Sequence, residues 1–171
     1  MSDLARFLPL SHRSAGDDAA APSDRRAQVA SVVTLAAAVL THEPAPATET
    51  FLREAGLAGA DTSGSLSRLA ETIATGRRRR IGDLTRVARA YLALPAERRG
   101  PLPFAVAGAV ALAASTRAPF ARRAAIAGHT VRATDAGWTF GRGPEISASA
   151  DDIVAFLTGL SDTPPRRNPI S

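Results

Sequence analysis

Apolar residues recur through the first hundred positions at the spacing of amphipathic helices. The pattern predicts four helices, at residues 24–41, 47–57, 65–75 and 81–94, and a proline or glycine stands near the end of each. In the first helix the apolar residues cover most of the circumference, which predicts a central position. Residues 25–100 are therefore expected to form a helical region. Residues 1–24 are rich in small and polar residues and are expected to be a flexible lead-in.

A further apolar run at residues 104–114 is rich in alanine and poor in β-branched and aromatic residues. That composition favours a buried helix over a strand. Pro119 then interrupts the chain, because a proline cannot continue a helix interior.

Beyond residue 125 the pattern changes to short runs separated by turn residues, which predicts strands at 126–135, 137–141 and 145–149. Ser149 stands three residues before Asp152, an arrangement that resembles a capping box and predicts a final helix. The fold class is thus expected to be α+β, with an N-terminal helical region followed by a small antiparallel β-meander and a C-terminal helix. Residues 101–161 would form this module and residues 162–171 a flexible tail.

The turn between the last two strands contains two glycines in the sequence GRGPEI. A dinucleotide-binding loop needs a third glycine and opens a helix, and this segment has neither feature. We interpret Gly141 and Gly143 as suppliers of the unusual backbone angles of a tight turn, with Pro144 fixing the direction of the strand that follows.

The 21 basic residues are all arginine, and the formal net charge is +5. This charge permits attraction to nucleic acid, anionic lipid or acidic metabolites without selecting one of them. The absence of cysteine excludes disulfides, thiolate nucleophiles and cysteine-ligated metals. The apolar runs are shorter than the roughly 18 to 20 residues that a membrane span needs, and the N-terminus lacks the pattern of a secretory signal. A cytoplasmic protein without a membrane partner is expected.

Residues 121–160 carry, in order, an arginine-rich lead, a strand ending in ATD, a Gly-Trp hairpin, a GxGP turn and a helix that ends near a glycine. This order resembles the C-terminal domain of mycothiol-dependent maleylpyruvate isomerase-like proteins, over about residues 102–160. The resemblance implies an α+β domain similar to the sterol-carrier type. In the full family this domain is paired with an N-terminal four-helix bundle that binds a divalent metal through histidines.

The histidines do not fit that metal site. The chain has only His12, His42 and His129, and no acidic residue stands four positions before any of them. Glu43 is adjacent to His42 and would point elsewhere on a helix. We therefore expect neither a family-type metal site nor a cofactor. The neighbouring carboxylates at residues 151 and 152 are typical of a helix start, where negative charge is stabilised by the helix dipole.

Two aromatic residues in the second predicted strand, Trp138 and Phe140, point to the same face. They are either a pair of core aromatics or the wall of a ligand pocket between the sheet and the helices. In the second reading Phe156 adds apolar wall, and Arg132 or Arg142 holds an anionic group.

A second candidate set consists of Arg77, Arg78, Arg79, Arg80, Arg86 and Arg89. Guanidinium groups bind phosphate oxygens bidentately, so the set could contact nucleic acid. A solvated turn at the C-terminal end of a helix is the simpler interpretation, because no aromatic residues stand among these arginines to stack on bases.

These observations predict a small binding or accessory protein for a small anionic or thiol ligand, related to the C-terminal module of thiol-dependent isomerases but without the metal site. Two alternatives stay open. One is a diverged mycothiol-dependent isomerase- or transferase-like enzyme, and the other is an arginine-rich nucleic-acid-binding protein. The sequence does not decide whether the chain catalyses a reaction, nor whether it is a monomer or an oligomer.

Overall fold

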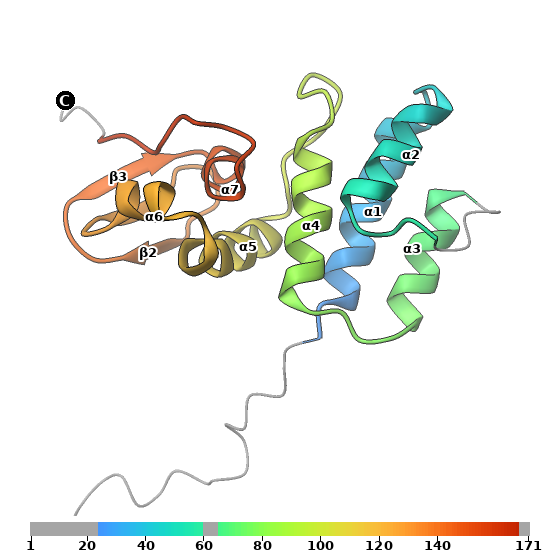
Figure 1. The fold of residues 1–171 in the computed structure, drawn as a ribbon, viewed down its shortest axis with the longest axis horizontal. Coiled ribbons are helices and arrows are strands. Elements are labelled where there is room, and N and C mark those ends of the chain that lie inside the picture. Colours follow the sequence, from blue (N-terminus) through green and yellow to red (C-terminus); the bar gives the residue numbers. More distant parts are fainter. Residues whose placement is uncertain (1–23, 60–64, 168–171) are drawn as a thin grey trace, which may run out of the picture.

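A computed structural model describes residues 24–59 and 65–167 and shows two lobes that meet along helix α4 (Figure 1). The first lobe contains α1 (Arg26–Leu40), α2 (Ala45–Glu54), α3 (Leu66–Thr75) and α4 (Ile81–Leu92). The second lobe contains α5 (Phe104–Arg117), α6 (Phe120–Ile126), β1 (Thr130–Ala133), β2 (Thr139–Gly141), β3 (Glu145–Ala148) and α7 (Ala150–Thr158). The predicted α+β class, with helices first and a helix after the sheet, is confirmed. The expected lead-in lies outside the described residues except for Asp24.

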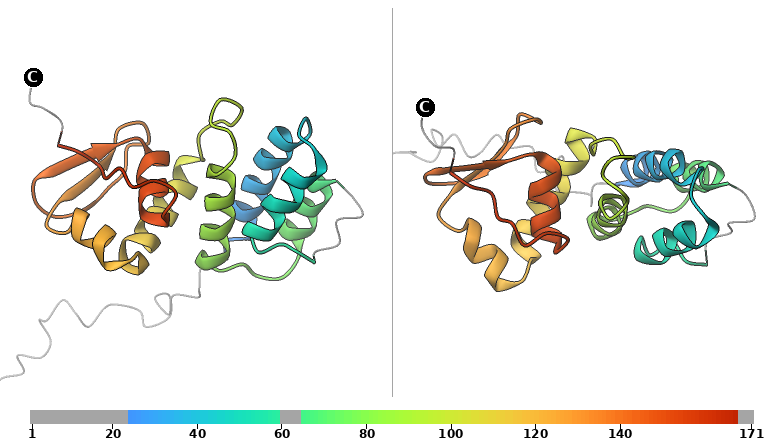
Figure 2. Two further views of the ribbon diagram at one scale, coloured as in Figure 1. Left: turned by 45° about the horizontal axis from the view of Figure 1, so that its top comes forward. Right: turned by 90° about the horizontal axis from the view of Figure 1, so that it is seen from above.

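The two lobes lie side by side in both views of Figure 2. One continuous hydrophobic core runs through both of them. Helix α1 packs against α3 and α4, and its residues Val29, Val32, Val33 and Ala36 are fully buried. This confirms the central position predicted from its apolar circumference. Helix α4 also packs against α5 and α7, so it belongs to the core of the first lobe and forms the boundary with the second.

The start of α1 is fixed by the carboxylate of Asp24. It accepts hydrogen bonds from the backbone N–H groups of Arg26 at 3.1 Å and Arg79 at 3.3 Å, and the Arg25 N–H donates to the Arg79 carbonyl at 2.9 Å. Desolvation works to raise the pKa of the Asp24 carboxyl, but these hydrogen bonds and the Arg26 guanidinium outweigh it and hold the pKa below 3.8. Asp24 therefore joins the first turn of α1 to the loop that precedes α4.

The sheet is mixed, which corrects the predicted antiparallel meander. Its order is β2-β1-β3, and β1 pairs antiparallel with β2 but parallel with β3. The cause is the turn at residues 142–144, which crosses the start of β1 and delivers β3 to its far side. Gly141 and Gly143 have positive φ angles of 88° and 120°, and a Cβ built on either would overlap a carbonyl oxygen of the segment before β1. The predicted role of these glycines in a turn is confirmed, and the close crossing explains why both are needed.

The strand predicted at 126–135 begins later than expected. Residues as far as Ile126 form the end of α6, and β1 starts at Thr130. Pro119 is the N-cap of α6, so the proline that ends α5 also begins a new helix.

Arg122 joins α6 to the end of α7. Its guanidinium donates to the carbonyls of Phe156 at 2.6 Å and Ser161 at 2.5 Å, and to the carboxylate of Asp162 at 2.7 Å. It also lies over the Phe156 ring at 5.2 Å. Further on, Arg166 pairs with Ser147 of β3 through two backbone hydrogen bonds, so this part of the chain lies against the second lobe. The rest of the tail expected at 162–171, residues 168–171, lies outside the described residues.

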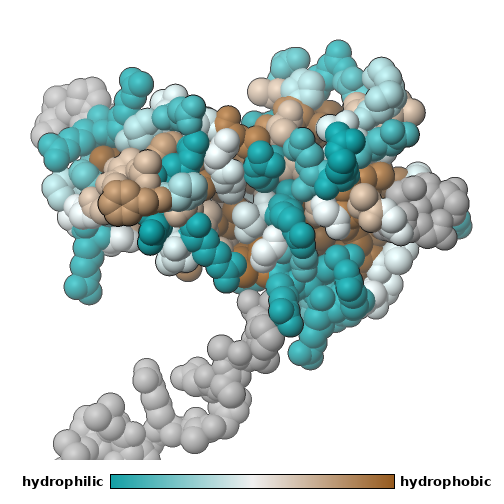
Figure 3. Space-filling model, in the orientation of Figure 1, coloured by the Kyte–Doolittle hydropathy of each residue, from teal (hydrophilic) through white to brown (hydrophobic). Residues whose placement is uncertain are grey.

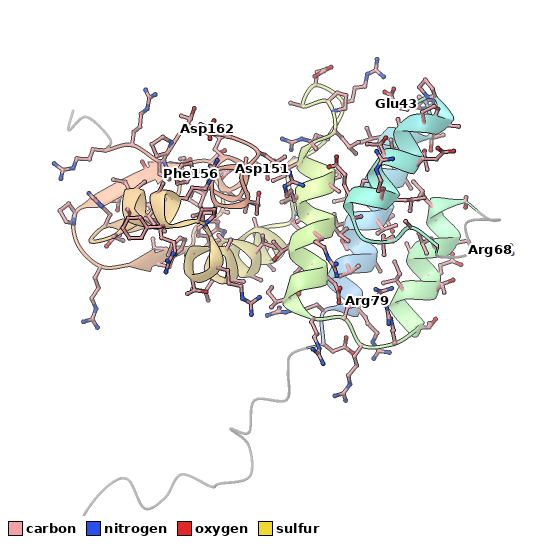
Figure 4. All side chains as sticks on the ribbon, viewed as in Figure 1. Glu43, Arg68, Arg79, Asp151, Phe156 and Asp162 are labelled. Carbon is pink, nitrogen blue, oxygen red and sulfur yellow. The ribbon has the colours of Figure 1, made fainter. Side chains whose placement is uncertain are left out.

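The linker between α4 and α5 is held by Asp151 at the start of α7, at the edge of the second lobe that faces α4 (Figure 4). Its carboxylate accepts from the Arg99 guanidinium at 2.6 Å and from the backbone N–H of Leu102 at 3.1 Å. Arg99 also lies over the ring of Tyr91 at 5.9 Å, and the Tyr91 hydroxyl donates to the Gly100 carbonyl at 2.9 Å. Both charged side chains are largely buried, at 14% and 17% exposed. We call this set the linker lock.

The crossing turn gives a first prediction. Gly143→Ala should lower the free energy of unfolding by more than about 2 kcal/mol, because it adds steric overlap to an unfavourable φ. Gly137→Ala is the matched control, since Gly137 also has a positive φ, of 66°, but has open space around it. It should cost about 1 kcal/mol. Equal losses for the two variants in urea unfolding would contradict the close crossing.

The linker lock gives a second prediction. Asp151→Ala should reduce the free energy of unfolding by about 1–3 kcal/mol, because it leaves the Arg99 charge buried without its partner. Asp152→Ala is the control: this carboxylate lies in the same helical turn and bonds the Ser149 hydroxyl at 2.7 Å. It should cost at most about 1 kcal/mol. Thermal unfolding of both variants makes the comparison, and a larger loss for Asp152→Ala would contradict the lock.

Tyr91 gives a third prediction, concerning pH. Burial raises the pKa of its phenol above 10.0, against the opposing charge of Arg99. The folded state therefore binds the phenolic proton of Tyr91 more tightly than the unfolded state does. The contribution of this group to the free energy of unfolding is present below pH 10 and is lost as the pH rises above it. Tyr91 is the only tyrosine, so phenolate absorbance reports on this residue alone. We expect the absorbance to rise together with unfolding, and titration of the folded protein near pH 10 would contradict the prediction.

Candidate functional site

A groove of about 300 Å³ lies between the two lobes, where α4 faces the C-terminal ends of α5 and α7. We call it the arginine groove. Helix α4 contributes one wall, and the bend between α5 and α6 together with the end of α7 contributes the other. Its lining residues are Gly82, Thr85, Arg86, Arg89, Ala113, Ala114, Arg117, Ala118, Pro119, Leu157 and Thr158.

Helical spacing explains why these α4 residues share a wall. Positions 82, 85, 86 and 89 fall on one face of a helix, while Leu84, Val87 and Tyr91 are buried on the opposite face. On the other wall, Arg117 occupies the last turn of α5, where positive charge is favoured by the helix dipole. Pro119 then turns the chain into α6, and the apolar side chains at this bend, among them the largely buried Ala114 and Ala118, line the groove.

The three arginines of the groove differ in how they are paired. Arg86 donates to the Asp83 carboxylate at 2.5 Å, whereas Arg89 lies 3.9 Å from Glu54 at the end of α2. Within residues 24–59 and 65–167, no carboxylate oxygen lies within 4.0 Å of the Arg117 guanidinium. One guanidinium is therefore firmly paired, one loosely, and one has no acidic partner among the described residues.

Asp83 is a permanent counter-ion for Arg86. Desolvation works to raise its pKa, but the backbone N–H of Arg80 and the Arg86 guanidinium outweigh that effect and hold the pKa below 3.8. The carboxylate is therefore charged at neutral pH. The guanidinium of Arg86 also lies beside Gly56, where an added Cβ would approach it to 3.2 Å. These contacts bring Arg86 close to Asp83 and Gly56, although its side chain is 58% exposed.

The chemistry of the groove is that of anion binding. Its polar side chains are guanidinium and hydroxyl groups, and the remaining lining is apolar. An arginine does not lose its proton in proteins, so it cannot act as a general base, but it donates two parallel hydrogen bonds to a carboxylate or phosphate.

The structure brings together only part of the ligand-binding set predicted from the sequence. Trp138 and Phe140 are stacked with ring centroids 6.1 Å apart, and both pack against the core. The Trp138 indole lies against Gly108 of α5, where a Cβ would approach it to 3.3 Å. Both aromatic side chains are partly buried at the edge of the core.

The other members of that set lie elsewhere. Phe140 pairs with Val131 across the sheet, so both side chains face the helices, and Arg132 faces the opposite side, 3.6 Å from Glu145. Arg142 is exposed in the crossing turn. Phe156 is 4% exposed, and the Arg122 guanidinium lies over its ring. Side chains along a strand alternate between the two faces of the sheet, so Arg132 and Phe140 lie on opposite faces. They therefore do not line one ligand pocket, contrary to the expectation.

The six arginines of the predicted nucleic-acid set divide between two places. Hydrophilic side chains gather at the lower edge of the molecule around the α3–α4 loop (Figure 3), where Arg77 and Arg78 are exposed. In the same loop Arg79 is partly buried, and Arg80 stands immediately before α4. Arg86 and Arg89 belong instead to the arginine groove. The six side chains do not form one unpaired basic surface.

Sequence reasoning missed Arg117, Leu157 and Thr158. The predicted helix ended at residue 114, so Arg117 fell in a linker, whereas α5 continues to Arg117. A basic residue shortly before a proline was the available signal for the end of a helix. The position of Arg117 beside α4 depends on how the two lobes pack, and local sequence patterns do not predict that packing.

Within the described residues, no group of three histidine, aspartate or glutamate side chains could hold a metal ion. His42 is exposed, the ring Nδ1 of His129 lies 3.0 Å from the Ala127 carbonyl, and His12 lies outside the described residues. In the part of the chain that the structure describes, no single helix combines the length and hydropathy needed to cross a membrane.

Comparison of the chain with protein-family models, with curated proteins and with solved structures finds no match. The resemblance over residues 102–160 to mycothiol-dependent isomerase-like proteins therefore stays a prediction. The feature of the fold that bears on function is the arginine groove.

Proposed function

We propose that this protein binds a small organic anion in the arginine groove. The observation that carries the proposal is the meeting of three arginines, two from one lobe and one from the other, around an apolar floor. Small-molecule sites commonly lie between domains and combine apolar walls with a few charged groups, and about 300 Å³ is at the lower end of their usual size.

The lining supports binding more than catalysis. An acid–base mechanism needs a group that exchanges protons near neutral pH, and the groove offers guanidinium groups and threonine hydroxyls. A binding role also agrees with the expectation that the chain retains an isomerase-like C-terminal module without the metal-binding half. That relation is part of the proposal, and its support is the order of sequence features after residue 121.

The nucleic-acid alternative has less support. Arg86 and Arg89 lie close to Asp83 and Glu54, so their charges are partly compensated before any ligand arrives. The described exposed residues Arg77 and Arg78 remain available for phosphate contacts. Steeply salt-dependent binding of an oligonucleotide, lost when residues 77–80 become serine, would favour that alternative.

Calorimetric titration of the full chain at low ionic strength tests the proposal, with benzoate, phthalate and phenyl phosphate as anions and benzamide as the neutral control. We expect saturable binding of at least one anion and a rise in melting temperature. Arg117→Gln should weaken that binding about tenfold or more, because it removes a charge-assisted hydrogen bond. Arg123→Gln, an exposed arginine on α6 outside the groove lining, is the control of equal charge change.

Two outcomes would contradict the proposal. The first is that none of the three anions binds. The second is that Arg123→Gln weakens binding as much as Arg117→Gln, because the effect would then come from net charge and not from the groove.

A further inference from the structure

The ion pairs around the arginine groove set the charge of the ligand that it can hold, an inference that rests on the proposed function. Three guanidinium groups line the groove, and two carboxylates, Asp83 and Glu54, lie beside them. The site therefore carries one positive charge in excess. A ligand with one negative charge would neutralise it.

The pairing also decides which arginines take part. Arg86 is the more exposed of the two paired arginines, at 58%, but it is hydrogen-bonded to Asp83 at 2.5 Å and lies against Gly56. Arg117 has no acidic partner among the described residues, so an anion does not have to displace one there. Arg89 is intermediate between Arg86 and Arg117. Its guanidinium lies 3.9 Å from the Glu54 carboxylate, which is beyond hydrogen-bond distance. Both side chains are partly exposed, at 43% and 39%. An exposed pair that is not hydrogen-bonded is weak and exchanges partners easily.

We infer that the arginine groove selects a monocarboxylate with a compact apolar body. Arg117 and Arg89 bind its carboxylate group, and Arg89 gives up its contact with Glu54 to do so. A carboxylate matches the fork of donors on a guanidinium. The apolar body would lie on the floor formed by Ala113, Ala114 and Leu157. A second negative charge on that body would lie over apolar side chains without a partner, and its desolvation would oppose binding.

The inference makes Glu54 a competitor of the ligand. In the unliganded protein Arg89 is shared with Glu54, and binding has to break that contact. Removal of the Glu54 charge should therefore strengthen binding of a monocarboxylate, whereas removal of a carboxylate elsewhere should not. Glu43 supplies the control, because it forms an ion pair with Arg98 in another part of the first lobe and Glu43→Gln changes the net charge by the same amount.

Calorimetric titration with benzoate, benzamide, phthalate and phenyl phosphate tests the inference on the wild-type chain and on four variants, Glu54→Gln, Glu43→Gln, Arg89→Gln and Arg117→Gln. We expect benzoate to bind about tenfold more tightly than benzamide or phthalate, and also more tightly than phenyl phosphate. Glu54→Gln should tighten benzoate binding about threefold or more, Glu43→Gln should leave it unchanged, and Arg89→Gln should weaken it. Melting temperatures of the variants show whether each is folded.

The outcomes separate this inference from the proposed function. Tighter binding of phthalate or phenyl phosphate than of benzoate, still dependent on Arg117, would overturn the charge selection and leave the proposed function standing. Loss of binding in Arg117→Gln with no change in a folded Glu54→Gln variant would overturn the competition for Arg89. Failure of all the anions to bind would overturn both proposals.

Discussion

The arginine groove depends on the packing of α4 against α5 and α7, and the linker lock ties the chain between α4 and α5 to α7. Asp151 belongs to α7 but bonds Arg99 and Leu102, so one carboxylate holds the chain that leaves α4 and the residue that leads into α5. The Arg99 and Asp151 side chains are largely buried and face each other, so each charge is compensated by the other, although the Arg99 Nε has no hydrogen-bond partner. A groove between lobes that swung freely would not hold guanidinium groups at a constant separation. The lock gives the groove this preorganisation before a ligand is present.

The crossing turn contributes to the same geometry from the other side of the second lobe. By carrying β3 to the far side of β1, it brings the start of α7 to the sheet edge opposite β2, where Asp135 accepts a hydrogen bond from Ala150 at 2.7 Å. A meander would have placed β3 beside β2 and α7 with it. The position of Asp151, and therefore the linker lock, follows from two glycines that permit a close backbone contact.

Features that depend on neighbouring residues were predictable from the sequence, and features that depend on contacts between distant segments were not. The five helices expected before residue 120 are present, and Ser65 and Ser149 cap α3 and α7, because periodicity and caps are properties of short segments. The order of the strands was predicted wrongly, because GRGP specifies a turn but not which neighbour the next strand will join. The groove was missed for the same reason. Arg89 and Arg117 lie on different helices, and only the packing of α4 against α5 brings them to one place.

In a chain whose basic residues are all arginine, the number of arginines says little about function, and their pairing says more. Arg99 and Arg122 are bound to carbonyls or carboxylates within the second lobe and its linker, and they stabilise the fold. Arg86 is held by Asp83, and Arg132 lies near Glu145 on the outer face of the sheet. Arg117 differs from these four, since it combines a position at an apolar groove with no acidic partner among the described residues. Arg117 is thus a charge without an acidic partner among the described residues, at a groove whose lining is largely apolar, and this combination is the physical basis for assigning the groove to a ligand.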